Sequence, residues 1–303
     1  LLRFKKEIEQ ASQINQPNLL KIYAHDEFEG QEYIVFEHFD SKPLSSILDA
    51  PLDIERAVEL ILDISPVIDA AHQKGLIHRG INPGSILVQQ TGHFFHAKLT
   101  DFGMGLLIDL AQVNQKEDII RIFGYLSPES SGILRKPVDS RSDIYSFGIL
   151  AYQLFTGQLP YKTDDVSSLI HQHIAQLPPA PSALNPKIPP VIENIILRLI
   201  AKDPQDRYQS LTGVIFDLME YQNQKSQGKE IIDFEIGRFD RLRQLSFSTR
   251  IIGRDAELAQ LNKLLNQTKQ SQGSLAFVFG EPGIGKSRLV DELRVHVHSL
   301  NGL

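Results

Sequence analysis

The sequence predicts an α+β domain in which helices dominate, followed by a linker and the first part of an α/β domain. Amphipathic helical patterns and two pairs of short apolar stretches fill residues 1–221. A polar stretch without periodicity follows and predicts a linker over residues 222–247. Residues 248–303 then contain a strand, a glycine-rich turn and a helix, which is the order of an incomplete α/β domain.

Helices are predicted where apolar side chains recur every three or four positions. These ranges are residues 2–16, 54–73, 143–155 and 191–201. Two hairpins are predicted where short apolar stretches flank a turn. Their strands are residues 19–25 with 32–36, and 85–88 with 96–99. A proline-rich surface loop is expected at residues 177–190.

Composition and charge limit the class of protein. The 303 residues are 42% hydrophobic and 22% charged, as in a soluble globular chain. A formal net charge of -6 argues against nucleic acid as a partner, because phosphate binding needs an excess of Lys and Arg. Cysteine is absent, which is consistent with a reducing cytoplasm. The apolar runs are far shorter than the roughly 20 residues that span a bilayer, so no membrane span is expected.

Seven segments of the first predicted domain occur in a characteristic order. They are RFKKEIEQASQINQPN, EYIVFEHF, HRGINPGSIL, DFG, SPE, DSRSDIYSFGILAYQLFTGQLPY and KDPQDRYQS. In this order they resemble the motifs of a bacterial, eukaryotic-type Ser/Thr protein kinase from its αC helix onward. The resemblance implies an α+β protein-kinase-like fold with a complete C-lobe, and an ATP-dependent transferase family. It matches Glu7 to the αC glutamate, Phe36 to the gatekeeper and Asp143 to the F-helix anchor, and it pairs Arg207 with Glu129.

The same resemblance implies that most residues for phosphoryl transfer are replaced. The family uses an Asp at the base position, a lysine two residues later and a magnesium-binding Asn. Gly80, Asn82 and Ser85 occupy these three positions. Glycine can neither accept nor orient a proton, and a neutral hydroxyl ligates magnesium weakly. Asp101 of the DFG motif remains as a metal ligand, so we predict a pseudokinase with no confident catalytic residue.

The activation segment offers no hydroxyl for a phosphorylation switch. No Ser, Thr or Tyr occurs between Phe102 and Gly124. Arg79, which receives the activating phosphate in the family, therefore has no phosphorylated partner within the segment. Glu117 or Asp118 could replace the phosphate with a fixed carboxylate, and a solvated charge pair is the alternative interpretation.

GEPGIGKS, residues 280–287, matches the pattern of a P-loop. Backbone N–H groups at its glycines would cradle phosphates, Lys286 would reach the terminal phosphates and Ser287 would offer its hydroxyl to Mg²⁺. The predicted nucleotide-binding residues are Gly280, Gly283, Gly285, Lys286 and Ser287. Asp101 and Ser287 are the predicted metal ligands, with ATP and Mg²⁺ as cofactors.

The context of this P-loop is also informative. SLAFVF before it predicts a buried strand, and SRLVDELRVHV after it predicts a helix. IIGRDAELAQLNKLL resembles the N-terminal box of AAA-related signal-transduction ATPases. The short stretch after Ser287 lacks an acidic strand and a sensor arginine, so nucleotide hydrolysis by this segment is not expected.

Together, the segments resemble large bacterial proteins in which a Ser/Thr kinase domain precedes an ATPase and often a sensor histidine kinase. We therefore expect a fragment of a multidomain signalling protein with protein partners or substrates and further domains toward the C-terminus. Two alternatives remain: an active Ser/Thr kinase that borrows another base, and a non-catalytic scaffold for ATPase oligomerisation. In the family, a glycine-rich loop and a β3 lysine would lie before Leu1, and the lysine would pair with Glu7. Their presence would keep nucleotide binding possible.

Overall fold

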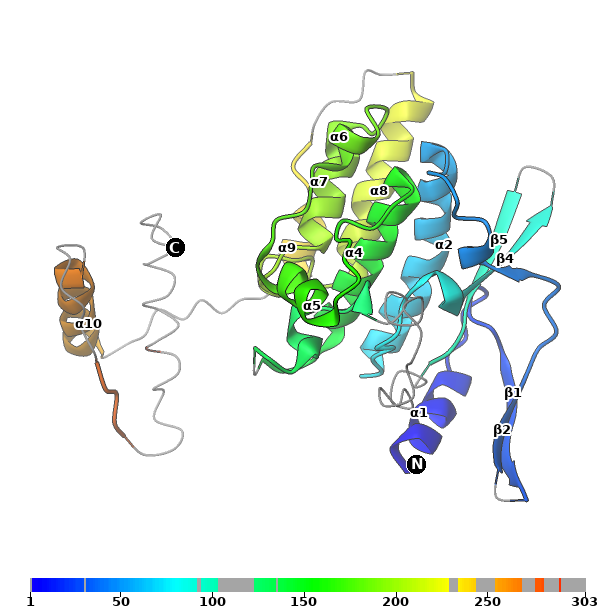
Figure 1. Cartoon of the computed structure of the whole chain (residues 1–303), viewed down its shortest axis with the longest axis horizontal. Coiled ribbons are helices and arrows are strands. Elements are labelled where there is room, and N and C mark those ends of the chain that lie inside the picture. The colour runs from blue at the N-terminus through cyan, green and yellow to red at the C-terminus, as the bar shows by residue number, and fades with distance from the viewer. Residues whose placement is uncertain are drawn as a thin grey trace. The chain divides into compact units, whose positions relative to one another are not determined.

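The computed structural model describes most of the chain. The described residues are 2–29, 31–91, 94–102, 123–134, 136–228, 234–243, 254–268, 276–280 and 289. The chain divides into two compact units, Leu1–Gln244 and Leu245–Leu303. The first unit contains the two sheets and the packed helices shown in Figure 1, and the second contains the helix α10.

A helix and a hairpin begin the first unit. They are α1 (Leu2–Ser12), β1 (Ile22–Phe28) and β2 (Gln31–Phe36). The two strands pair antiparallel, and Ile22 lies opposite Phe36. Ile8 and Ala11 on α1 are buried, as their helical spacing requires. The predicted helix and hairpin are therefore confirmed, with each element shifted or shortened by a few residues.

A second, three-stranded sheet follows in the order β3-β4-β5. Its strands are β3 (Lys42–Pro43), β4 (Ile86–Thr91) and β5 (Phe94–Leu99), with short 3₁₀ helices at Leu44–Ser46 and Pro83–Ser85. β4 and β5 form the second predicted hairpin, with Ile86 opposite Leu99. The backbone N–H of Leu20 donates to the Leu99 carbonyl at 2.9 Å, so the chain before β1 runs beside the end of β5.

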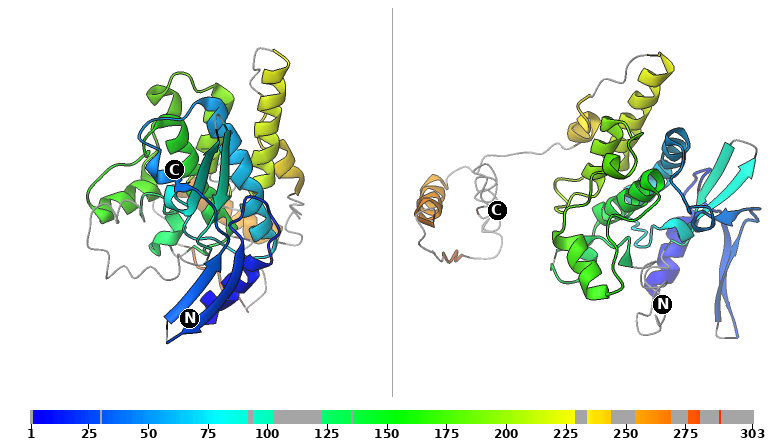
Figure 2. Two further views of the ribbon diagram at one scale, coloured as in Figure 1. Left: turned by 90° about the vertical axis from the view of Figure 1, so that its right-hand side faces the viewer. Right: turned by 45° about the horizontal axis from the view of Figure 1, so that its top comes forward.

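Packed helices form the larger part of the first unit (Figures 1 and 2). They are α2 (Ile54–Gln73), α4 (Ser140–Thr156), α5 (Val166–Ala175), α6 (Pro181–Leu184), α7 (Pro190–Leu199) and α8 (Leu211–Ser226), with a 3₁₀ helix at Pro128–Ser131. The helices predicted at residues 54–73, 143–155 and 191–201 are confirmed. The predicted proline-rich loop contains the short helix α6, which begins at Pro181, because proline is well suited to the first position of a helix.

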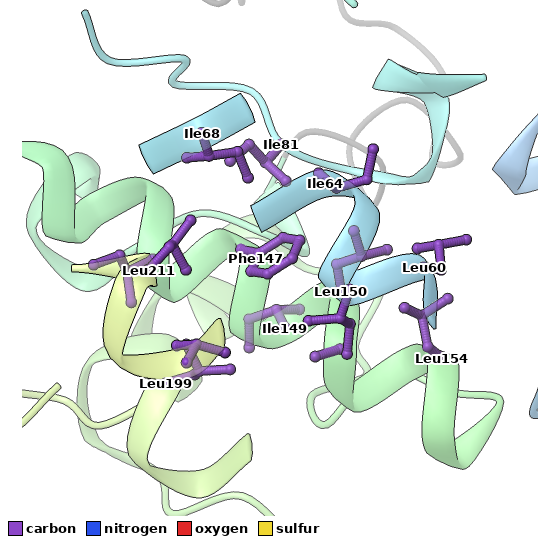
Figure 3. Packing of buried hydrophobic residues seen from close by; sticks show 14 of the residues in the cluster. Leu60, Ile64, Ile68, Ile81, Phe147, Ile149, Leu150, Leu154, Leu199 and Leu211 are labelled. Carbon is purple, nitrogen blue, oxygen red and sulfur yellow. The ribbon is translucent and has the colours of Figure 1, made fainter. Parts of the chain in front are cut away.

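The hydrophobic core lies where α2, α4, α7 and α8 meet. Figure 3 shows side chains from all four helices packed together: Leu60, Ile64, Ile68, Phe147, Ile149, Leu150, Leu154, Leu199 and Leu211. Nearly every side chain of α4 is buried, so this helix is surrounded on all sides. A Cβ at Gly148 would lie 2.6 Å from the Leu199 Cβ, which shows how closely α4 and α7 approach.

The predicted linker of residues 222–247 is partly structured. α8 continues to Ser226, and a further short helix, α9 (Arg238–Arg243), belongs to the first unit. Phe234 and Ile236 pack against the core, which explains why this stretch stays with the kinase-like unit. Of the polar residues that suggested a linker, 221–226 form the last part of α8.

The second unit contains α10 (Asp255–Thr268), which confirms the helix that the apolar spacing of residues 251–265 predicts before the P-loop. Residues 276–280 lie outside regular secondary structure, so the buried strand predicted there is wrong for this chain. Phe277 and Phe279 are 71% and 87% exposed. A strand needs a neighbour for its backbone groups, and none pairs with residues 276–280 in the part of the chain that the structure describes. None of the helices described has the length and apolar character to cross a membrane.

Candidate active site

Asp143 anchors the loop in which the kinase base would lie. Its side chain is buried at the first turn of α4, and its two oxygens accept the backbone N–H groups of His78 and Arg79, each at 2.8 Å. His72 contacts the same carboxylate through Nε2 at 2.8 Å. Burial raises the pKa of the Asp143 carboxyl, but the hydrogen bond and charge of His72 and the nearby His78 outweigh it and leave the pKa lowered. The predicted anchoring position of Asp143 is confirmed.

His78 connects this loop to the DFG segment. Its Nε2 donates to the Thr100 carbonyl at 2.7 Å, and its ring lies 4.6 Å from the ring of Phe102. Burial lowers the pKa of His78, so the imidazole stays neutral at pH 7. Arg79 and Asp101, on either side of this contact, have φ angles of 62° and 68°. Both residues are thus held in the left-handed region by the surrounding bonds.

Asp101 is the remaining candidate for a metal ligand in the kinase-like unit. Burial raises the pKa of its carboxyl, so a bound cation would favour the ionised form. The Thr100 hydroxyl lies 3.5 Å from Asp101 Oδ1. Among the described residues, no group of three or more His, Asp or Glu side chains could enclose a metal. Mg²⁺ beside nucleotides is usually held by one carboxylate together with phosphate oxygens and water, and Asp101 would supply that carboxylate.

The loop around Gly80 is closed by its own hydrogen bonds. Asn82 Nδ2 donates to the Gly80 carbonyl at 2.8 Å, and Asn82 Oδ1 accepts the N–H of Gly84 at 2.7 Å. The Ser85 hydroxyl donates to the Asn82 carbonyl at 2.9 Å and accepts the Asn82 N–H at 3.2 Å. Ser85 is only 2% exposed. The side chains at the former lysine and asparagine positions therefore stabilise the turn itself.

Arg79 pairs with the αC-position glutamate. Its Nη1 donates to Glu7 Oε1 at 2.9 Å and to Glu7 Oε2 at 3.1 Å. Sequence reasoning missed this pair, because the family resemblance assigns a lysine to Glu7 and a phosphate to Arg79. The opposite charges of Arg79 and Glu7 were the available signal. Glu117 and Asp118, the alternative partners considered for Arg79, lie outside the described residues.

Glu129 and Arg207 form a buried, bidentate ion pair. Arg207 Nη1 and Nη2 donate to the two Glu129 oxygens at 2.7 and 2.9 Å, and Ser142 Oγ donates to Oε1 at 2.7 Å. Burial raises the pKa of Glu129, but the hydrogen bonds and charge of Arg207 outweigh it and leave the pKa lowered. The other Arg207 N–H groups bond the carbonyls of Ala201, Arg141 and Lys202. The predicted pair is confirmed, and all five guanidinium donors are satisfied.

The predicted P-loop is only partly within the described residues. Gly280 is exposed at the end of residues 276–280. Gly283, Gly285, Lys286 and Ser287 lie outside the described residues, so the phosphate cradle and the magnesium contact of Ser287 stay predictions.

The fold, the Asp143 anchor and the Glu129–Arg207 pair define a protein kinase domain. The protein kinase domain family matches residues 2–219, and the AAA ATPase domain family matches residues 250–300. The chain therefore belongs to the protein kinase domain family, and it carries a short AAA ATPase segment after the kinase domain.

Three similar curated proteins carry the names of bacterial Ser/Thr protein kinases. A Lactococcus lactis protein named probable serine/threonine-protein kinase PknB is 32% identical over 236 residues, which cover 77% of this chain and 37% of the relative. Serine/threonine-protein kinase PknB of Mycobacterium tuberculosis is 33% identical over 73% of this chain and 36% of its own. Pkn1 of Myxococcus xanthus is 34% identical, with shares of 70% and 30%. The chain thus spans about a third of the length of these relatives.

Solved structures agree with this assignment. The kinase domain of Mycobacterium tuberculosis PknI matches with a TM-score of 0.56 and 25% identity, over 72% of this chain and 78% of that one. Rad53 1-466 in complex with AMP-PNP matches with a TM-score of 0.59 and 22% identity, over 71% and 54%. The second match supports the fold alone.

Proposed function

We propose that the kinase-family domain is a catalytically impaired regulatory module in a multidomain signalling protein that also carries an ATP-binding AAA-type module. The observation that carries this proposal is the loop at Gly80, whose remaining side chains are hydrogen-bonded to its own backbone. No side chain is present there to accept the substrate proton, and Asn82 and Ser85 bond the backbone of the loop. Proton transfer and electrostatic stabilisation each contribute orders of magnitude to catalysis, so their loss should reduce phosphoryl transfer severely.

The structural parts of the domain are retained, and this supports a role in binding. The Asp143 anchor, the His78 contact to Thr100 and the Glu129–Arg207 pair are all buried and hydrogen-bonded. Such a domain can hold a ligand or a protein partner without chemistry, since fold and activity are separable. ATP and Mg²⁺ are the ligands that the family uses, and Asp101 would hold the metal.

An active Ser/Thr kinase is the second candidate. Asp101 of the DFG motif has a φ of 68°, and the neighbouring Phe102 ring packs against the His78 ring. The curated relatives carry the name of serine/threonine-protein kinases. This candidate requires a base from outside the loop, which would have to replace the side chain missing at Gly80.

Phosphate transfer from labelled ATP to a mixture of protein substrates distinguishes the two candidates. The assay uses the longer protein that contains this chain, with Lys286→Ala to silence the P-loop. We expect incorporation no greater than that of the same protein with Asp101→Ala. Transfer that Asp101→Ala abolishes would establish the active kinase instead.

A further inference from the structure

The segment after α8 returns to the surface of the kinase-like unit. Residues 234–237 lie outside regular secondary structure and lead into α9. The Phe234 and Ile236 side chains pack against the hydrophobic core. The Phe239 ring stacks on Phe216 of α8, with ring centroids 4.3 Å apart and planes at 20°. The apolar side chains of this segment therefore attach it to the helices that precede it in sequence.

Asp240 provides the first polar anchor of this segment. It is 2% exposed, and its two oxygens accept the backbone N–H of Gln209 at 2.9 and 3.0 Å. Oδ1 also accepts the N–H of Ser210 at 3.0 Å, and Arg198 Nη2 lies 3.3 Å from Oδ2. Ser210 is the N-cap of α8 and makes no side-chain cap of its own. Asp240 thus places a carboxylate at the start of α8, where the helix dipole favours negative charge.

Gly237 provides the second anchor. Its N–H donates to Asp217 Oδ2 at 2.6 Å, and Arg198 Nη1 donates to the neighbouring Ile236 carbonyl at 3.0 Å. Gly237 has a φ of 71°, and a Cβ there would lie 1.7 Å from Arg198 Nη1. Any larger residue would therefore have to displace the guanidinium from the Ile236 carbonyl, so this position depends on glycine for both backbone conformation and space.

We propose that residues 234–240 form a latch, which docks on α7 and α8 and releases from them as one unit while the core stays folded. The latch is the C-terminal end of the first unit, which ends at Gln244, so it can leave α7, α8 and the adjoining core side chains without breaking the path of the chain through the core. With the latch docked, residues 244–249 before the AAA ATPase match can span about 20 Å at most. With the latch released, the free chain before the AAA ATPase match is residues 227–249, which can span about 80 Å at most. The latch would thereby set the effective concentration of the ATPase segment around the kinase-like unit.

Hydrogen exchange of the whole chain, resolved at single amides, tests whether the latch opens separately from the core. The N–H groups of Gln209, Ser210 and Gly237 are the donors that the latch contacts protect. They should exchange with one common opening constant, at least tenfold larger than that of Ile149 and Leu150 in the buried helix α4. Exchange at the rate of α4 would show that the segment opens only with the core, and would overturn the proposal.

Two glycine variants supply a matched comparison. Gly237 and Gly228 both have positive φ, 71° and 63°, but a Cβ at Gly228 meets no atom within 4 Å. Gly237→Ala should accelerate exchange at Gln209 and Ser210 at least tenfold and leave α4 unchanged, whereas Gly228→Ala should leave both unchanged. Asp240→Asn should accelerate the same amides to a smaller degree. Unchanged exchange at Gln209 in Gly237→Ala, or equal acceleration in α4, would contradict a separately opening latch.

Discussion

Removal of the Glu129 carboxylate should destabilise the first unit far more than removal of an exposed carboxylate. In Glu129→Ala, the Arg207 guanidinium stays buried with its charge uncompensated and with two of its N–H groups facing an empty space. Breaking a buried pair in this way costs about 3–5 kcal/mol. For a unit of this size, each kcal/mol lowers the melting temperature by about 2–4 °C, so a fall of about 6–20 °C is expected.

Thermal unfolding followed by tyrosine fluorescence measures this effect, since the chain has no tryptophan and Tyr145 lies next to Arg207. Glu220→Ala, at an exposed position of α8, is the matched control and should change the melting temperature little. Glu129→Leu combined with Arg207→Met should be less destabilising than the sum of the two single changes, because neither charge is then stranded. Equal melting temperatures for Glu129→Ala and Glu220→Ala would refute the reasoning.

Two further predictions concern Lys202 and the P-loop. Burial, with a smaller contribution from Arg207, lowers the pKa of Lys202 to about 7, so between about pH 7 and 9 the unfolded chain binds more protons and stability should rise with pH. Lys202→Met should reduce this rise, measured as the change with pH of the free energy of unfolding in urea. The contribution of Lys202 to that slope is at most about 1.4 kcal/mol per pH unit, and less with solvent screening. An unchanged slope in Lys202→Met would contradict the assignment. By isothermal titration, this chain should bind ATP weakly, while extension through the acidic strand should give submillimolar binding that Lys286→Ala abolishes. Tight, Lys286-dependent binding by the short chain would exclude this account.

Local periodicity and motif order predicted most of the kinase-like unit. Residues 54–73 form α2 with the predicted bounds, because one strongly amphipathic pattern covers the whole helix. The Glu129–Arg207 pair followed from the order of two motifs. By contrast, residues 276–280 carry a strand pattern but no strand, since a local pattern cannot provide the neighbouring strands that pairing requires.

The contacts that sequence reasoning missed join residues that are distant in the chain. Arg79 and Glu7 are 72 positions apart, and each already had another partner in the family pattern. Asn82 was compared only with the lysine it replaces, so its bonds to the loop backbone were not foreseen. Asp240 lies in a stretch that was predicted as a linker, and its role depends on two backbone N–H groups before α8. Such contacts follow from packing, which no short window of sequence contains.

The most direct test of the central claim is phosphate incorporation by the longer protein in the Lys286→Ala background. Three forms are compared side by side: the unchanged loop with Asp101, the unchanged loop with Asp101→Ala, and a restored loop that carries Gly80→Asp, Asn82→Lys and Ser85→Asn. The account predicts that the wild-type loop and Asp101→Ala give the same background. Incorporation by the wild-type loop that clearly exceeds Asp101→Ala would contradict it.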